Sequence, residues 1–117
     1  MTKNRTAVQT HAPMKPVWHQ ILLAIATGHR HGYAIREAVE ERTDGAIRLW
    51  PATLYGTLRR MEEAGLIAEL EGDDDPRGKR PFQLTEEGRA VLEAETRRLE
   101  RLVDLAHTDS VLASPDR

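Results

Sequence analysis

Small and hydrogen-bonding side chains gather between residues 52 and 60 of this 117-residue chain. If the apolar residues of this stretch turn inward, a helix here presents Ala52, Tyr55, Gly56, Arg59 and Glu63 on its outer side, and Thr53 adds a second hydroxyl near its start. Hydroxyl groups donate hydrogen bonds to phosphates and base edges, and an arginine reaches either a guanine or the backbone. A glycine leaves room for close approach. The pattern favours a helix that enters the major groove of duplex DNA, and an ordinary amphipathic surface helix is the alternative.

A second group of basic residues follows an acidic run. Arg77, Lys79 and Arg80 come directly after the aspartates of residues 73–75. Basic side chains on a hairpin commonly meet phosphates, and each contact steepens the salt dependence of DNA binding. The aspartates would repel the same phosphates. A phosphate-binding loop and a solvated, charge-balanced loop therefore both stay open.

Residues suited to catalysis or metal binding are sparse. The chain has no cysteine, and its histidines supply only two short pairs, His29 with His31 and Asp104 with His107. Zinc sites usually need three or four converging ligands. No nucleophile with a base, phosphate-binding loop or calcium-loop spacing stands out. We expect neither an enzyme nor a bound cofactor or metal, and a metal sensor is a minor alternative.

Apolar periodicity and turn signals place these groups on a series of short elements. Apolar residues recur at helical spacing after Pro16, after Gly32 and after Pro51, and proline suits the first turn of a helix. Thr85 is suited to cap a last helix. We expect helices from Pro16 to Gly28 and at 32–42, 51–64 and 85–107, a very short strand at 47–49, and a hairpin of strands 67–71 and 80–84.

Three helices followed by a hairpin are typical of a winged helix-turn-helix domain. The expected fold is mainly α-helical with a small β-hairpin: a DNA-binding domain at 15–84 and a C-terminal dimerisation helix at 85–107. Residues 1–14 have no period and are expected to be a mobile tail, and residues 108–117 a frayed end. The inward faces are expected to hold Ile21, Leu22, Ile25, Ala34, Ile35, Ala38, Val39, Leu54, Leu58 and Met61.

The last helix carries an apolar seam with the spacing of a coiled coil. Its members step by four and three residues: Leu92, Thr96, Leu99, Val103 and Ala106. Pairing with a second copy about a two-fold axis would bury the seam and set two recognition helices about one DNA turn apart. We expect a homodimer, with Trp18 in the core or at the interface. Folding of the helix back over its own domain is the alternative.

Trp50 stands directly before the expected third helix. An apolar residue there can form a hydrophobic staple by packing against the first turn of the helix. It could instead line a ligand cleft. We favour the staple.

The net charge of −2 is unevenly distributed. Residues 1–50 carry seven Lys or Arg against four Asp or Glu, and the acidic excess lies in the remainder. DNA responds to the local field of the docking face rather than to the sum. The clearest apolar run, residues 21–26, is far shorter than the roughly 20 residues of a membrane span, and no signal peptide is visible. We expect a cytoplasmic protein without a membrane partner.

Several short runs together resemble the PadR family of transcriptional regulators. They are HGYAI at 31–35, PATLY at 51–55, LRRMEEAGLI at 58–67 and LTEEG at 84–88. Their order covers about residues 18–106. The resemblance implies a dimeric winged-helix repressor, paired through its C-terminal helix, that binds a palindromic operator on duplex DNA. Some relatives release DNA when a phenolic acid or an aromatic drug binds, so the resemblance also suggests a small aromatic effector.

By position, the resemblance implies roles for individual residues. Thr53 and Tyr55 would contact DNA, and Tyr33 would lie near a phosphate. Lys79 and Arg80 would match the basic start of the second wing strand.

Four positions depart from the family pattern. Relatives often have a small polar residue where Trp50 stands, a glycine at Ala52 and a proline at Gly56. An aromatic residue is usual where Pro81 stands. The departures bear on the wing contact and the sequence preference, and they leave the expected fold unchanged.

A winged helix used only to bind other proteins is the alternative function. The acidic hairpin tip and the net negative charge favour it, whereas Arg59, Arg60 and the Thr-Leu-Tyr run at 53–55 oppose it. A third class is a sensor in which DNA binding is secondary to a ligand or a metal.

Overall fold

The computed structural model describes residues 13–71 and 80–113. They form α2 (Pro16–Ala26), α3 (Gly32–Arg42), α4 (Pro51–Glu63), β1 (Ile67–Glu69), β2 (Phe82–Leu84) and α5 (Glu86–Thr108). The two strands pair antiparallel, with Ala68 opposite Gln83. The predicted order of three helices, a hairpin and a last helix is confirmed, but the strands are shorter than the predicted 67–71 and 80–84.

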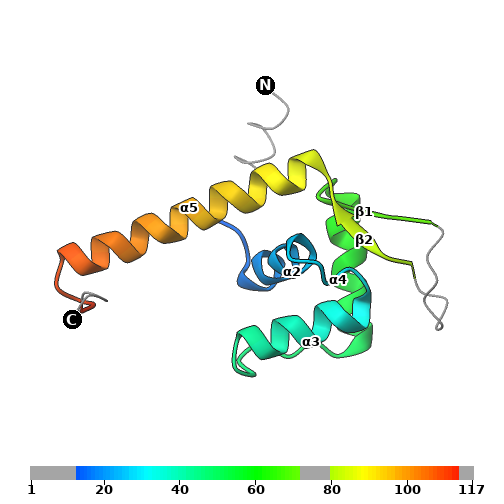
Figure 1. The fold of residues 1–117 in the computed structure, drawn as a ribbon, viewed down its shortest axis with the longest axis horizontal. Helices are drawn as coiled ribbons and strands as arrows, with labels where there is room; N and C mark the ends of the chain where they lie inside the picture. The colour runs from blue at the N-terminus through cyan, green and yellow to red at the C-terminus, as the bar shows by residue number, and fades with distance from the viewer. Residues whose placement is uncertain (1–12, 72–79, 114–117) are drawn as a thin grey trace.

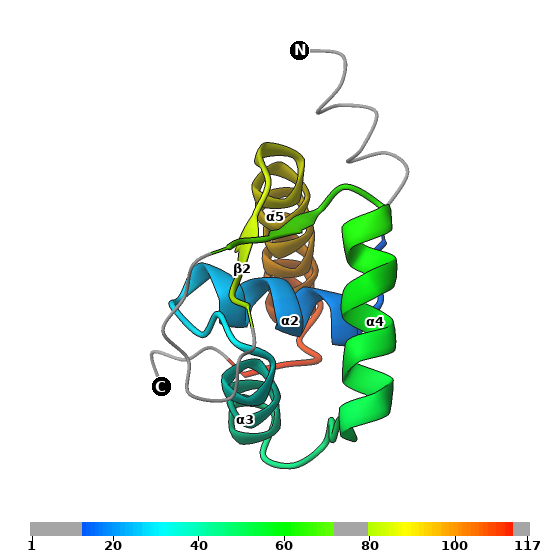
Figure 2. The same cartoon turned by 90° about the vertical axis from the view of Figure 1, so that its right-hand side faces the viewer.

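Helices α2, α3 and α4 and the hairpin share one core, and α5 runs out of it (Figure 1). α2 contacts α3, α5 and β2, while α4 contacts α3 and β1. Figure 2 shows α4 along one side of the molecule, with α5 seen nearly end-on. This is a winged helix-turn-helix fold, in which α3 and α4 form the helix-turn-helix and β1 and β2 form the wing.

Local signals account for the helix boundaries. Pro16 and Pro51 open α2 and α4. Gly28 and Gly65 lie just beyond the ends of these helices with φ of +106° and +81°, a conformation that residues with a Cβ rarely adopt. Thr85 caps α5, as predicted, because its hydroxyl accepts a hydrogen bond from the third residue of the helix at 2.9 Å.

The core is built from the faces that the apolar periodicity predicted. Each predicted core residue is at most 7% exposed, except Ala34, which is half-buried. Trp18 is half-buried and packs against this core. The hairpin and α5 complete the core with Leu66, Ile67, Phe82, Val91 and Leu92.

The short strand predicted at 47–49 is wrong, since that segment has no regular secondary structure and pairs with no strand in the described residues. Leu49 is buried instead, and its carbonyl accepts a hydrogen bond from Nε of Arg36 at 2.6 Å. The backbone N–H of Phe82 in β2 donates to the carbonyl of Arg30 at 2.8 Å. The α2–α3 turn, rather than the α3–α4 segment, therefore supports the edge of the wing.

Both ends of the described chain differ somewhat from the expectation. Met14, predicted to belong to a mobile tail, is buried. Residues 1–12 and 114–117 lie outside the described residues. Beyond α5, the backbone N–H of Val111 donates to the carbonyl of Ala106 at 2.9 Å, so the chain turns back after the helix.

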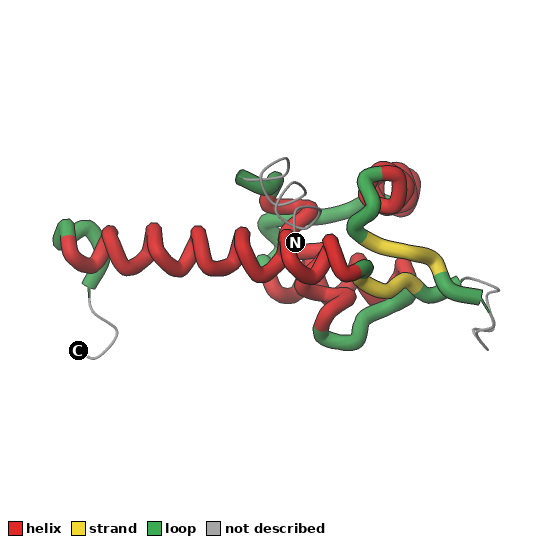
Figure 3. The backbone as a smooth tube through the Cα atoms, turned by 90° about the horizontal axis from the view of Figure 1, so that it is seen from above, coloured by secondary structure: helices red, strands yellow, loops and turns green. Residues whose placement is uncertain are grey.

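The C-terminal half of α5 extends away from the rest of the described structure (Figure 3). Leu99 is 36% exposed, and Leu102 and Val103 are nearly half exposed. No helix in the described part of the chain has the length and apolar character needed to cross a membrane. These exposed apolar side chains lie in the C-terminal half of α5.

A buried polar cluster joins α2 to α5. Glu95 is 3% exposed and accepts two hydrogen bonds from Arg98, at 2.9 and 2.6 Å. The bond from Arg98 is the main cause of a lowered pKa of Glu95, and the backbone of Met14 contributes in the same direction. Beside it, Nε2 of His19 lies 2.9 Å from Oγ1 of Thr96, and burial lowers the pKa of His19.

Acid should destabilise the fold through this cluster. A histidine with a lowered pKa takes up protons more readily when unfolded, so its stabilising effect is lost as the pH falls below about 6.5. Glu95 acts in the same direction at lower pH, because its contribution is lost as the pH falls through its lowered folded pKa. We expect the melting temperature to fall between pH 7.5 and 5, and His19→Gln to flatten this fall. Equal slopes for the two proteins would contradict the assignment to His19.

Candidate nucleic-acid interface

Helix α4 divides into a buried face and an exposed face, as predicted. Leu54, Leu58 and Met61 are at most 1% exposed. Thr53 and Arg59 are exposed on the other side. Figure 2 shows that no other described element covers this outer side of the helix. The outer face of α4 is therefore open to a partner.

The segment before α4 holds the start of the helix in place. Arg36, which the helical pattern of α3 would leave in solvent, is half-buried and donates to the carbonyl of Leu49. The hydroxyl of Thr43 accepts from the backbone N–H of Ile47 at 3.0 Å. Since these bonds join α3 to the segment that leads into α4, the orientation of α4 depends on α3. Sequence patterns do not reveal the Arg36 bond, because its acceptor is a backbone carbonyl 13 residues away.

Tyr55 is less exposed than the sequence predicted. Its ring is half-buried and packs against the core. Its hydroxyl lies against Gly32, where a Cβ would overlap it. Tyr55 therefore joins α4 to the start of α3. A glycine at position 32, within the HGYAI run, leaves the space for this ring.

Tyr33 lies next to this junction and is 37% exposed. Its ring stacks on that of His31, with centroids 5.6 Å apart and an interplanar angle of 21°. The pair occupies the first turn of α3 and the residue before it. The structure thus leaves part of Tyr33 accessible at the end of α3 that contacts Tyr55.

The arginines of α4 are arranged differently from one another. Arg59 is exposed on the outer face. Nη2 of Arg60 donates to the hydroxyl of Thr57 at 3.2 Å, and this hydroxyl in turn donates to the carbonyl of Thr53 at 2.9 Å. Nη1 of Arg60 lies 3.8 Å from where a Cβ of Gly56 would stand. The guanidinium of Arg60 therefore lies back along the helix, beside Gly56.

Trp50 does not form the staple that the sequence favoured. The side chain is 66% exposed, whereas a staple requires burial against the first helical turn. Such exposure also disagrees with a closed ligand cleft. Pro51 and the buried Leu49 on either side direct the chain so that this ring points to solvent.

Of the predicted wing residues, Arg80 is described, and it is exposed just before β2. Arg77 and Lys79 lie outside the described residues, as does the acidic run. The choice between a phosphate-binding loop and a charge-balanced loop stays a prediction.

The seam on α5 divides into two parts. Leu92 is 7% exposed, because its own chain covers it, and Thr96 contacts His19 of α2. Leu99 and Val103 lie further along the helix and are exposed, with Ala106 half-buried beyond them. Leu102 and Leu105, which the four-three spacing omitted, add exposed apolar surface in the same half of the helix.

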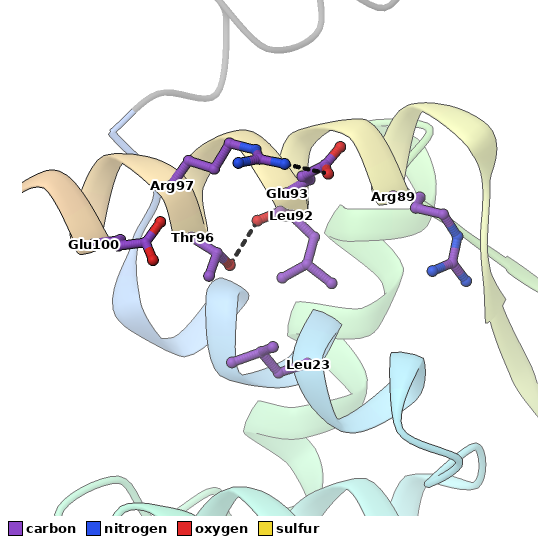
Figure 4. Close-up of a pocket in the computed structure, with 7 residues that line it drawn as sticks. All are labelled: Leu23, Arg89, Leu92, Glu93, Thr96, Arg97 and Glu100. Carbon is purple, nitrogen blue, oxygen red and sulfur yellow. Dashed lines mark hydrogen bonds and ion pairs between the residues drawn. The ribbon is translucent and has the colours of Figure 1, made fainter.

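An open pocket of about 480 Å³ lies beside the seam, between α2 and α5. In Figure 4, Leu92 of α5 and Leu23 of α2 face each other across it, and Arg97 pairs with Glu93 on the outer side at 3.1 Å. The pocket has an apolar floor and a charged rim. In the described residues, no group of three or more His, Cys, Asp or Glu side chains could hold a metal ion.

A three-helix core, a two-stranded wing and a second helix of the helix-turn-helix with an open outer face define a winged-helix regulator. Residues 21–94 match the Transcriptional regulator PadR-like family. The chain therefore belongs to the PadR-like family of transcriptional regulators, as the resemblance indicated.

Several solved structures and a curated protein are similar to this chain. A PadR family transcription regulator from Clostridium difficile superposes with a TM-score of 0.67 at 25% identity, over 80% of this chain and 97% of that one. Bacillus subtilis PadR, solved in complex with operator DNA, superposes with a TM-score of 0.58 at 22% identity, over 69% of this chain and 45% of that one. An uncharacterised 37.1 kDa transposon protein of Streptomyces fradiae is 43% identical over 82 residues, which are 70% of this chain but 22% of that protein. The chain thus corresponds to about a fifth of this last relative.

Proposed function

We propose that this chain acts as a homodimer that binds a two-fold symmetric operator through α4 and represses transcription. The open outer face of α4, held in place by bonds to α3, carries the proposal. Thr53 and Arg59 are exposed there, while the opposite face is fully buried. A rigid helix with accessible donors on one side can enter a major groove about 12 Å wide.

The charge along α4 supports this orientation. From Pro51 to Arg60 the helix has no acidic residue, and its acids stand at the end, at Glu62 and Glu63. The positive end of the helix dipole lies at its N-terminus. The N-terminal half of α4 would therefore meet phosphates without local repulsion, despite the net charge of the whole chain.

The exposed half of α5 supports the dimer. Leu99, Leu102 and Val103 present apolar side chains to solvent in a single chain. A second α5 running antiparallel or parallel beside the first would remove these side chains from water. The α2–α5 pocket continues the same surface, so the charged rim at Glu93 and Arg97 would border the interface.

Repression and release are the finer parts of the proposal. A dimer that covers an operator excludes other proteins from that DNA, and this is the simplest route to repression. A small aromatic effector could act by changing the packing of α5 and so the spacing of the two α4 helices. Such regulation, and a cytoplasmic location, stay predictions.

A salt series with one matched pair of variants tests DNA binding. The probe is the duplex upstream of the chain's own gene, since regulators of this family often control their own expression. We expect the logarithm of affinity to fall linearly with the logarithm of salt concentration. Arg59→Ala should reduce the affinity about tenfold per half-site, because each protomer loses one charged contact. Arg101→Ala is the control, since Arg101 is also exposed but lies on α5.

Equal affinity for both variants would remove Arg59 from the interface. If a folded dimer bound no duplex at low salt, including duplexes selected from a random pool, DNA binding itself would be excluded. A winged helix that binds other proteins would then be the better interpretation, as the acidic residues 73–75 first suggested.

A further inference from the structure

Trp50 is the most exposed aromatic side chain in the described part of the chain, at 66%. It occupies the N-cap of α4 without making a side-chain capping bond. Ser, Thr, Asp and Asn are preferred at this position, and replacing them with a residue that cannot cap costs about 1 kcal/mol. The chain therefore has a large apolar ring where a small polar residue would stabilise the helix better.

The backbone that carries this ring is held on both sides. Leu49, the preceding residue, is buried and accepts the bond from Arg36. The carbonyl of Trp50 accepts from the backbone N–H of Leu54 at 2.8 Å, within the first turn of α4. Pro51 restricts the backbone further. The indole ring thus projects from a fixed point at the leading end of α4.

Exposed residues lie before and after Trp50 in the chain. Leu49 is buried and Ile47 is half-buried, whereas Arg48 and Trp50 are both exposed. Thr53 lies one helical turn further on and is also exposed. A cation, an aromatic ring and a hydroxyl therefore line the approach to the N-terminal end of α4. Arg48 lies 3.5 Å from Glu40 in an exposed ion pair, which is weak enough to exchange for a phosphate contact.

We propose that Trp50 contacts the major groove and reads a thymine methyl group at a fixed position in each half-site. This inference rests on the proposed DNA binding by α4. N-terminal residues of a recognition helix contact base edges, so a ring at the N-cap is close to the bases. The thymine methyl is the apolar group that the major groove presents, and apolar side chains recognise it by contact. Burial of the ring against it also removes apolar surface from water.

The test compares thymine with deoxyuridine, which differ only in this methyl group. Duplexes that the wild-type protein selects from a random pool serve as the probe, and each conserved thymine is replaced in turn. Burial of one methyl contributes about 0.8 kcal/mol, so one replacement should weaken wild-type binding about fourfold per half-site. The same replacement should leave the affinity of Trp50→Ala unchanged, because that variant has lost the ring.

Fluorescence supplies a second measurement. The difference in emission between the wild type and Trp50→Ala isolates the signal of Trp50 from that of Trp18. We expect the selected duplex to protect this signal from iodide quenching.

A Trp50→Ala protein that keeps the wild-type affinity and the same penalty for deoxyuridine would overturn the inference, while the proposed function would stand. Failure of the wild type to bind any duplex would instead remove the proposed function on which it rests.

Discussion

Replacing Gly88 with alanine is expected to destabilise this protein more than any other single methyl addition in the described residues. Gly88 is the third residue of α5, where the helix crosses the backbone between α4 and β1. A Cβ at this position would overlap the carbonyl oxygen of Leu66 and lie 2.9 Å from its carbonyl carbon. The same carbonyl oxygen accepts a hydrogen bond from the backbone N–H of Thr85 at 3.0 Å.

Neither Leu66 nor residue 88 can shift to relieve this overlap without losing other contacts. The side chain of Leu66 is fully buried, and the N–H of Gly88 is held by the cap at Thr85. We expect a loss of about 3 kcal/mol in the free energy of unfolding, which lowers the melting temperature by about 15 °C.

Gly56→Ala is the matched control, because a Cβ there meets nothing closer than Arg60 at 3.8 Å. That variant should gain about 0.5 kcal/mol from improved helix propensity. Similar melting temperatures for both variants would show that the contact at Gly88 relaxes.

Leu99→Glu is expected to convert the proposed dimer to monomers and to weaken operator binding by about two orders of magnitude. A carboxylate at the centre of an apolar seam cannot be desolvated without a partner. A monomer then binds one half-site and loses the gain from simultaneous contact, which is on the order of a hundredfold or more. Light scattering measures the mass, and a mobility shift measures the affinity.

The control for this variant is Arg101→Glu, which places the same carboxylate on the polar side of α5. Arg101 is exposed and should leave the dimer intact. Leu99 is itself 36% exposed in the single chain, so its replacement should preserve most of the fold. A Leu99→Glu protein that stays dimeric would assign the interface to a different surface, and the exposed residues of α5 would need another partner.

The two variants test different levels of the molecule. Gly88→Ala tests how the start of α5 packs against the backbone of Leu66. Leu99→Glu tests whether the exposed half of α5 pairs with a second copy of the chain. The LTEEG run that helped to indicate the family contains both Thr85, which caps α5, and Gly88, which makes room for Leu66. This family motif is therefore explained by how the wing joins the last helix, rather than by contact with DNA.

Sequence alone determined the order of the elements, the helix boundaries and the core faces. Pro16, Pro51 and Thr85 act within one turn of their own positions, so their effects are visible locally. The apolar period likewise identified Leu54 and Leu58 as buried, because helical geometry repeats every 3.6 residues. The family resemblance was correct for the same reason, since its motifs are short local runs at characteristic spacings.

Only the tertiary structure decided which side chains stay accessible. Leu92 and Leu99 belong to one seam by spacing, yet α2 covers the first and leaves the second exposed. Tyr55 was expected to face outward, but Gly32 of α3 receives its ring. Trp50 was expected to be buried, but it is exposed.

The same distinction applies to the segment at 47–49, which has the alternation of a strand but no strand beside it. Whether an extended segment pairs, or a side chain is covered, depends on which distant part of the chain arrives next to it. Arg36 reaches Leu49 across 13 residues, and Phe82 reaches Arg30 across more than 50. Local periodicity contains no information about such encounters, because they are set by the packing of whole elements rather than by the preferences of neighbouring residues.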